Sequence, residues 1–145
     1  MIINRPMKVR QISGGWNVQY AIYNFYTTSG SPSFVHFKTN VACSGNAIVM
    51  IEARGYNYGR ACATRCSWQF YAWNNNLYNK GMSTPIPGMD AYSMYKSSDG
   101  YACIIAYATS HYFNGFILDA YSHTAYPANV DILASVQTDQ SGAYY

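Results

Sequence analysis

The side chains best suited to acid–base or nucleophilic chemistry are few in this chain and lie far apart. A glycosidase needs two carboxylates that flank a cleft, and the spacing of the six acidic residues makes no two of them neighbours. No serine or cysteine stands in the glycine frame of an exposed nucleophile. The sequence therefore predicts a protein that is not an enzyme, has no catalytic residues and needs no cofactor. The residues considered are Glu52, Asp90, Asp99, Asp119, Asp131 and Asp139, with His36, His111 and His123.

A different chemistry, the binding of sugars, is indicated by one short segment rich in aromatic and amide side chains. The C–H faces of sugar rings pack on tryptophan and tyrosine, and an asparagine amide both donates and accepts hydrogen bonds. An ordinary turn beside a core tryptophan has the same composition, because asparagine favours turns, and this alternative stays open. The candidate ligand-binding residues are Trp73, Asn74, Asn75, Asn76 and Tyr78.

The four cysteines do not have the spacing of a metal site. Cys62 and Cys66 are separated by three residues, which is not a zinc-knuckle spacing, and no histidine pair is nearby. Cys66 and Cys103 fall in expected strands, where a free cysteine acts as a small buried apolar residue. We expect all four cysteines, Cys43 included, to be structural thiols that bind no metal. The alternative is a disulfide formed after release into oxidising surroundings.

Two alternating runs must position these side chains, and they form the centre of the expected fold. Residues 48–54 place Val49, Ile51 and Ala53 on one face, and residues 66–71 place Cys66, Trp68 and Phe70 on one face. Gly55 and Gly59 allow a tight bend between the runs. The pattern predicts two neighbouring strands of one antiparallel sheet.

The rest of the chain repeats this pattern of short strands and turns. Residues 83–89 contain Pro85, Pro87 and Gly88 and are expected to be irregular, and residues 97–100 predict a hairpin turn. His36 alternates within a strand, and we expect it at the surface or in an interface. No window has a helical period, so the sequence predicts an all-β protein, an antiparallel β-sandwich of jelly-roll type. The further strands are expected at residues 18–28, 34–40, 77–82, 92–96, 101–108, 116–121 and 130–137.

The composition indicates a surface of unusual chemistry. The chain has 145 residues, of which 10% are charged and sixteen are tyrosine. Tyrosine provides large contact area at small entropic cost, which is typical of recognition surfaces and subunit contacts, and we expect a stable homo-oligomer. The net charge of +3 forms no basic stripe, so we expect no nucleic-acid binding. The absence of a long apolar run or signal peptide predicts no membrane insertion and synthesis in a cytoplasm.

Five phrases of the sequence resemble a module near the C-termini of tail-fibre proteins of marine and freshwater bacteriophages. They are FVHFKTN (34–40), GYNYG (55–59), WQFY (68–71), YKSSDGY (95–101) and HYFNGFILDAY (111–121), in the order that the module uses. The resemblance implies an oligomeric, usually trimeric, β domain on the virion surface that contacts the host. Fibre proteins usually carry an attachment domain and a shaft before this module, whereas only residues 1–33 precede it here, which favours a small spike or a capsid-decorating protein.

Residues 1–17 are expected to be an irregular attachment arm that leads into a single β domain at residues 18–145. The arm carries a proline, a glycine pair and the basic residues Arg5, Lys8 and Arg10, and its order must come from a partner. With the resemblance, the sequence predicts a virion-surface structural protein, released by lysis, anchored to other virion proteins by this arm and exposed for attachment to a host-surface glycan. The alternative is a capsid-decorating cement protein that stabilises the head.

Overall fold

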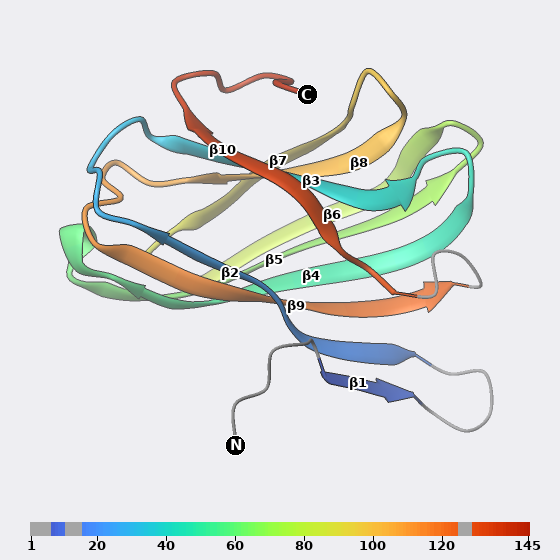
Figure 1. Ribbon diagram of the computed structural model, residues 1–145, viewed down its shortest axis with the longest axis horizontal. Helices are drawn as coiled ribbons and strands as arrows, with labels where there is room; N and C mark the ends of the chain where they lie inside the picture. Colours follow the sequence, from blue (N-terminus) through green and yellow to red (C-terminus); the bar gives the residue numbers. More distant parts are fainter. Residues whose placement is uncertain (1–6, 11–15, 125–128) are drawn as a thin grey trace.

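Two antiparallel sheets packed face to face make up the structure (Figure 1). The computed structural model describes residues 7–10, 16–124 and 129–145. The six-stranded sheet has the order β1-β2-β9-β4-β5-β6, and the four-stranded sheet has the order β10-β3-β8-β7. The strands are β1 (Met7–Arg10), β2 (Asn17–Thr27), β3 (Phe34–Ala42), β4 (Asn46–Asn57), β5 (Cys62–Trp73), β6 (Asn76–Pro87), β7 (Asp90–Lys96), β8 (Tyr101–Tyr107), β9 (Asn114–Thr124) and β10 (Ile132–Thr138). The predicted all-β sandwich is confirmed.

The strands pair as nested hairpins. β4 pairs with β5, which follows it directly, while β3 pairs with the distant β8 and β2 with the distant β9. β9 lies beside β4, so the order β9-β4-β5-β6 is a Greek key, in which a later strand returns to lie next to the first of three consecutive strands.

The inner faces of β4 and β5 supply the centre of the core, as their alternation predicts. The six side chains of both strands that the alternation places inward are no more than 2% exposed. Trp68 also joins the two sheets, because its indole N–H donates a hydrogen bond to the carbonyl oxygen of Ile105 on β8, 3.1 Å away. The six are Val49, Ile51, Ala53, Cys66, Trp68 and Phe70.

Two segments that we expected to be irregular form strands at the edges of the six-stranded sheet. β6 continues through Pro85 to Pro87, whereas the sequence predicted an end at residue 82. An edge strand tolerates proline because the missing N–H costs no ladder bond on the open side. At the opposite edge, residues 7–10 form β1 and pair with β2, so this part of the expected irregular arm takes its order from the sheet.

The outer face of the four-stranded sheet is covered by the C-terminal segment. His36 was expected at the surface, yet it is fully buried, and its Nε2–H donates to the carbonyl oxygen of Gln140 at 2.7 Å. The Tyr95 hydroxyl lies 3.0 Å from His36 Nδ1 and accepts hydrogen bonds from the backbone N–H groups of Tyr144 and Tyr145. Burial lowers the pKa of His36 and so favours the neutral ring. In that form Nδ1 can accept a hydrogen bond from the Tyr95 hydroxyl.

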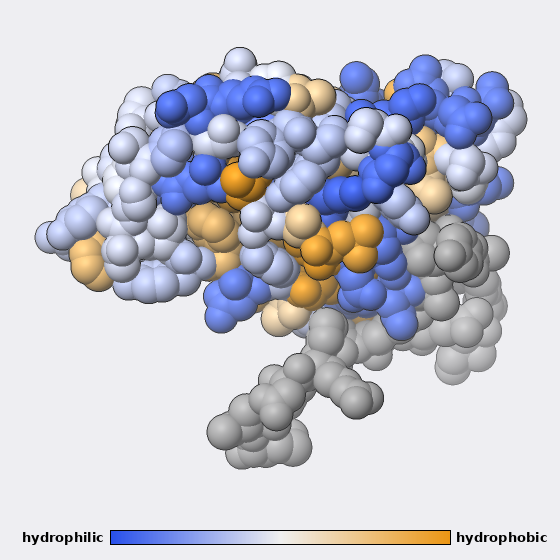
Figure 2. Space-filling model, turned by 45° about the horizontal axis from the view of Figure 1, so that its top comes forward, coloured by the Kyte–Doolittle hydropathy of each residue, from blue (hydrophilic) through white to orange (hydrophobic). Residues whose placement is uncertain are grey.

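The surface has the character that the composition predicts. Figure 2, in which the top of the Figure 1 view comes forward, shows a mostly pale to blue surface with orange confined to small separate areas.

A single 3-10 turn, η1 (Tyr58–Arg60), is the only helical segment of the described residues. None of the described residues belongs to a helix with the length and apolar character needed to cross a membrane.

Candidate functional site

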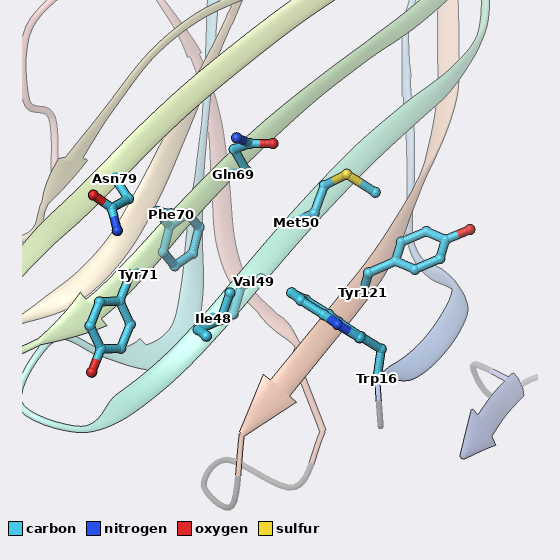
Figure 3. Close-up of a pocket in the computed structure, with 9 residues that line it drawn as sticks. All are labelled: Trp16, Ile48, Val49, Met50, Gln69, Phe70, Tyr71, Asn79 and Tyr121. Carbon is cyan, nitrogen blue, oxygen red and sulfur yellow. The ribbon is translucent and has the colours of Figure 1, made fainter. Parts of the chain in front are cut away.

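A groove lies on the outer face of the six-stranded sheet (Figure 3). Its volume is about 620 Å³, within the range of small-molecule sites, which are concave and mostly apolar with a few polar groups. No lining residue carries a charged side chain. The lining residues are Trp16, Ile48, Val49, Met50, Gln69, Phe70, Tyr71, Asn79 and Tyr121.

The floor of the groove follows from the register of three neighbouring strands. Met50 on β4 is the partner of Gln69 on β5 and of Tyr121 on β9, and Ile48 is the partner of Tyr71. Partners across an antiparallel ladder project to the same face of the sheet. These five side chains are therefore neighbours on one surface, although they come from distant parts of the chain.

A β-bulge places an additional amide beside this floor. Gln69 pairs with Gly81 and Tyr71 with Tyr78, so β6 has one residue more than β5 between these pairs. Asn79 lies in the bulge with φ of 49°, a left-handed conformation that asparagine tolerates better than most residues. Bulges re-aim side chains in this way. Figure 3 shows the Asn79 amide on the β6 side of the groove.

The absence of a side chain at Gly81 leaves room for the Gln69 side chain. A Cβ atom on residue 81 would lie 2.7 Å from Gln69 Nε2 and 2.9 Å from its Cδ, too close for the present arrangement. Neither the Gln69 amide nor the Asn79 amide has a hydrogen-bond partner among residues 7–10, 16–124 and 129–145. Each amide therefore has donor and acceptor atoms available for a ligand.

Aromatic rings form the two sides of the groove. On one side Trp16 is 40% exposed and packs edge-to-face with His123 at 6.1 Å between ring centroids. On the other side Tyr71 and Trp73 have parallel planes with centroids 6.3 Å apart, and Tyr78 packs against Trp73 at 6.1 Å. These parallel and tilted rings continue the aromatic surface beyond the groove to the end of β5.

The predicted ligand-binding segment lies at this end of the groove, and its members have different roles. Trp73 is 48% exposed, so the alternative of a core tryptophan is wrong. Asn74 and Asn75 have φ of 51° and 58°, as required at both central positions of a type I′ hairpin turn. The Asn76 side chain accepts a hydrogen bond from the Leu77 backbone N–H at 2.9 Å. The structure brings Trp73 and Tyr78 together, while the turn itself explains the asparagines.

Most groove residues were absent from the candidate set, although part of the signal was present in the sequence. The outward positions of residues 48–54 and 66–71 include Ile48, Met50 and Gln69, but without the register their shared surface was not visible. Trp16 was assigned to the arm. The bulge at Asn79 leaves no recognisable mark in the sequence.

Two carboxylates that nothing in the sequence spacing brings together are neighbours in the sheet. Glu52 on β4 and Asp119 on β9 are direct Cα partners. Arg54 Nη2 lies 2.5 Å from Asp119 Oδ2, and Glu52 Oε1 lies 3.7 Å from Nε of both Arg54 and Arg65. Asp119 Oδ1 also accepts the backbone N–H of Ala21 at 2.7 Å. Both carboxylates are thus engaged in a network with two guanidinium groups.

The proposed attachment residues are only partly within reach of the structure. Arg5 lies outside the described residues. Lys8 and Arg10 lie on β1, where they are the Cα partners of Gln19 and Asn17 on β2. The basic residues of β1 therefore belong to the free edge of the six-stranded sheet rather than to a separate irregular segment.

The four cysteines are free, and burial makes two of them unreactive. All four have no disulfide partner, and burial raises the pKa of both Cys66 and Cys103 to about 12. A thiol with such a pKa stays protonated and is a poor nucleophile. In the described part of the chain, no three histidine, cysteine or acidic side chains are grouped so that they could hold a metal ion.

Comparison with known proteins adds no family to this geometry. The chain matches no protein-family model, and no curated protein and no solved structure is significantly similar to it.

Proposed function

We propose that this protein is a non-enzymatic attachment module of a bacteriophage surface that binds a host-surface glycan in the groove of its six-stranded sheet. One observation carries the proposal: the groove is uncharged, holds about 620 Å³, and combines aromatic rings with two unpaired amides. Aromatic faces accept the C–H faces of sugars. The amides of Gln69 and Asn79 supply the donors and acceptors that sugar hydroxyl groups need.

The lining also favours one class of sugar. An acidic sugar would bring a carboxylate into a site with no cationic side chain, so its desolvation would not be offset by an ion pair. A neutral sugar loses only hydroxyl hydrogen bonds, which Gln69, Asn79, Tyr71 and Tyr121 can replace. The groove therefore suits a neutral glycan. Because the lining side chains stand on paired strands, little ordering is needed on binding.

The bacteriophage context and the trimer rest on the sequence resemblance and on the surface. Large exposed apolar and aromatic side chains, such as Tyr92 at 44% and Leu133 at 55%, occur away from the groove. A surface with low charge and many exposed rings is suited to contacts with other copies or other virion proteins. In this proposal Lys8 and Arg10 at the edge strand, with Arg5, contact the particle.

Binding by the purified protein tests the groove. We expect a bacterial surface polysaccharide or neutral oligosaccharide array to give binding that Tyr71→Ala and Trp16→Ala each weaken about tenfold or more, which corresponds to about 1.4 kcal/mol. Tyr92→Ala on the four-stranded sheet is the matched control and should bind normally. The absence of any bound glycan, or equal binding by the groove variants, would refute the proposal. Release of free sugar by the protein would instead reveal an enzyme.

The position of the protein on purified particles tests its attachment role. Antibody labelling should place it at an exposed site, and the triple change Arg5→Ala, Lys8→Ala and Arg10→Ala should lower its occupancy, more so in low salt, where surface charges act furthest. Each exposed contact alone contributes under about 1 kcal/mol. Full occupancy of the triple variant at every salt concentration would exclude an electrostatic anchor. Heads that lose stability without the protein would favour the cement role.

A further inference from the structure

A second group of exposed aromatic rings lies at the end of β4 away from the groove, where η1 meets the loops before β3 and β9. We call Tyr26, Tyr58, Tyr112 and Phe113 the Phe113 cluster; their side chains are 43–63% exposed. Phe113 lies at its centre, with ring centroids 4.7 Å from Tyr112, 6.2 Å from Tyr58 and 6.4 Å from Tyr26. The path along β4 from Met50 to Asn57 measures about 23 Å at the usual rise per residue, so the cluster is separate from the groove.

Phe113 is held in a backbone conformation that disfavours its side chain. The Asn114 N–H donates to the carbonyl oxygen of His111 at 2.9 Å, and Phe113 has φ of 50° at the third position of this turn. Glycine or asparagine is preferred at such a position, and the left-handed region costs other residues about 1–2 kcal/mol. The ring remains 43% exposed, so burial offsets only part of this cost. A strained residue that presents an exposed ring indicates a functional position.

The turn stands on a buried base that fixes its geometry before any ligand arrives. His111 and Asn114 are fully buried. The His111 Nε2–H donates to the carbonyl oxygen of Ser33 at 2.8 Å, and the Asn114 amide donates to His111 Nδ1 at 2.8 Å. The backbone N–H of Gly59 donates to the carbonyl oxygen of Tyr112 at 2.8 Å, which joins η1 to the turn.

Arg60 gives this end of the molecule a positive charge that no carboxylate of the described residues neutralises. It ends η1, two residues after Tyr58, and its charge acts on His111, whose pKa it helps to lower after burial. Arg60 forms no ion pair within residues 7–10, 16–124 and 129–145. Its Nη1 is buried without a hydrogen-bond partner in that part of the chain. Such a group calls for a ligand or ordered solvent.

We propose that the Phe113 cluster and Arg60 form a second sugar site, which binds a sugar that carries a carboxylate. The rings offer stacking surfaces for the C–H faces of the sugar. A guanidinium pairs with a carboxylate through two parallel hydrogen bonds, and the charge of Arg60 complements an acidic ligand. This site and the groove are independent, so the protein would recognise two different parts of a glycan.

Two acidic probes and their neutral esters test the ligand class. The probes are trigalacturonate and 3′-sialyllactose, each compared with its methyl ester in calorimetric titrations of the unmodified protein. We expect at least one acid to bind, and its ester, which keeps the rings but loses the charge, to bind at least tenfold more weakly. Failure of both acids to bind, or equal binding of acid and ester, would overturn the proposal.

Three variants separate this site from the groove. Phe113→Gly keeps the turn conformation and removes the ring, and Arg60→Gln removes the charge; each should weaken binding of the acidic probe tenfold or more without lowering the melting temperature. Tyr71→Ala in the groove should leave it unchanged. If Phe113→Gly instead dissociates an oligomer at unchanged probe affinity, the cluster is a contact between copies of the chain and the proposal fails. Neutral lipid vesicles are a further probe of the same variants. If Phe113→Gly or Arg60→Gln loses binding to the vesicles but not to the acidic sugar, the cluster binds a lipid surface and the proposal likewise fails.

Discussion

The groove and the Phe113 cluster are both aromatic, but the chain builds them in different ways. The groove lies on paired strands, and its irregular backbone is limited to Asn79, which tolerates a positive φ. In the cluster, Tyr26 lies at the end of β2, and the other three residues lie on η1 or in the turn before β9. The central residue Phe113 does not tolerate a positive φ in this way. The outer face of a sheet thus provides a broad surface whose order comes from the register, whereas a turn presents rings outward at a cost in backbone strain.

The two regions also differ in charge. No charged side chain lines the groove, and elsewhere on the same sheet Glu52, Arg54 and Asp119 bind one another. Beside the cluster Arg60 has no such partner in the described residues. The uncharged lining of the groove and the unpaired charge beside the cluster are the physical basis for expecting two classes of sugar.

Both regions depend on one core, and the largest predicted effect tests that dependence. Trp68 is fully buried, and its indole N–H bonds across the sandwich to the Ile105 carbonyl. Trp68→Ala should lower the free energy of unfolding by about 3–5 kcal/mol and weaken both sites together, as measured by urea unfolding and by titration with both kinds of probe. Trp73→Ala, at an exposed ring, is the control and should cost under about 1 kcal/mol. A Trp68 variant that lost only one site would show that the regions are stabilised separately.

Acid should lower the free energy of unfolding through two buried histidines. Burial lowers the pKa of His36 and of His111 below the usual 6.5, so below that pH the unfolded chain binds protons that the folded chain does not. The contribution of these two histidines to the free energy of unfolding should therefore be constant above about pH 6.5 and fall as the pH drops from there toward the folded-state values. Urea unfolding at pH 7.5 and 5.5 measures the change.

Hydrogen exchange shows where the acid acts. His111 supports the turn at residues 111–114 through Asn114 and Ser33, while no histidine contacts the turn at Asn74 and Asn75 in any described bond. Amide exchange at pH 5.5 should therefore rise more in the first turn than in the second, after correction for the intrinsic rate. His123→Gln should keep this difference. Equal exchange in both turns would show that acid loosens the whole fold and that His111 has no local role.

Local patterns in the sequence predicted the features of the fold that depend on neighbouring residues. Alternation placed Val49, Ile51 and Trp68 in the core, and the asparagine run predicted a loop or turn after Trp73, where the structure has a hairpin turn. Each of these inferences uses only the two-residue period of a strand or the backbone preferences of a single residue. The all-β sandwich follows from repeating them along the chain.

Features that depend on distant pairing were not predictable in the same way. Glu52 and Asp119 are partners only because β9 returns to lie beside β4, and no local pattern states that order. Trp16 joins the groove from a segment expected to be an arm. Phe113 has a positive φ, a conformation that a phenylalanine in the sequence does not indicate. Register, return connections and strained turns are thus what the sequence left undetermined.

The contrast between Asn79 and Phe113 can be measured directly, and its expected effect is the smallest. At a positive φ, alanine keeps the steric penalty of Cβ, whereas glycine has none. Phe113→Ala should therefore be less stable than Phe113→Gly by about 1 kcal/mol, because both variants lack the ring and differ only in the strain. Asn79→Ala and Asn79→Gly should differ in the same direction, since both positions are left-handed.

Comparison with the parent protein then separates the two residues. Asparagine pays little for this conformation, so Asn79→Gly should be no more stable than the parent. Phe113→Gly relieves strain but loses ring contacts, and its free energy of unfolding should stay within about 1 kcal/mol of the parent value. Urea unfolding of the four variants measures these differences, and glycan titration shows the cost in binding at each site. If Phe113→Ala is as stable as Phe113→Gly, the turn relaxes without cost, and strain cannot be the reason that a phenylalanine at this position indicates function.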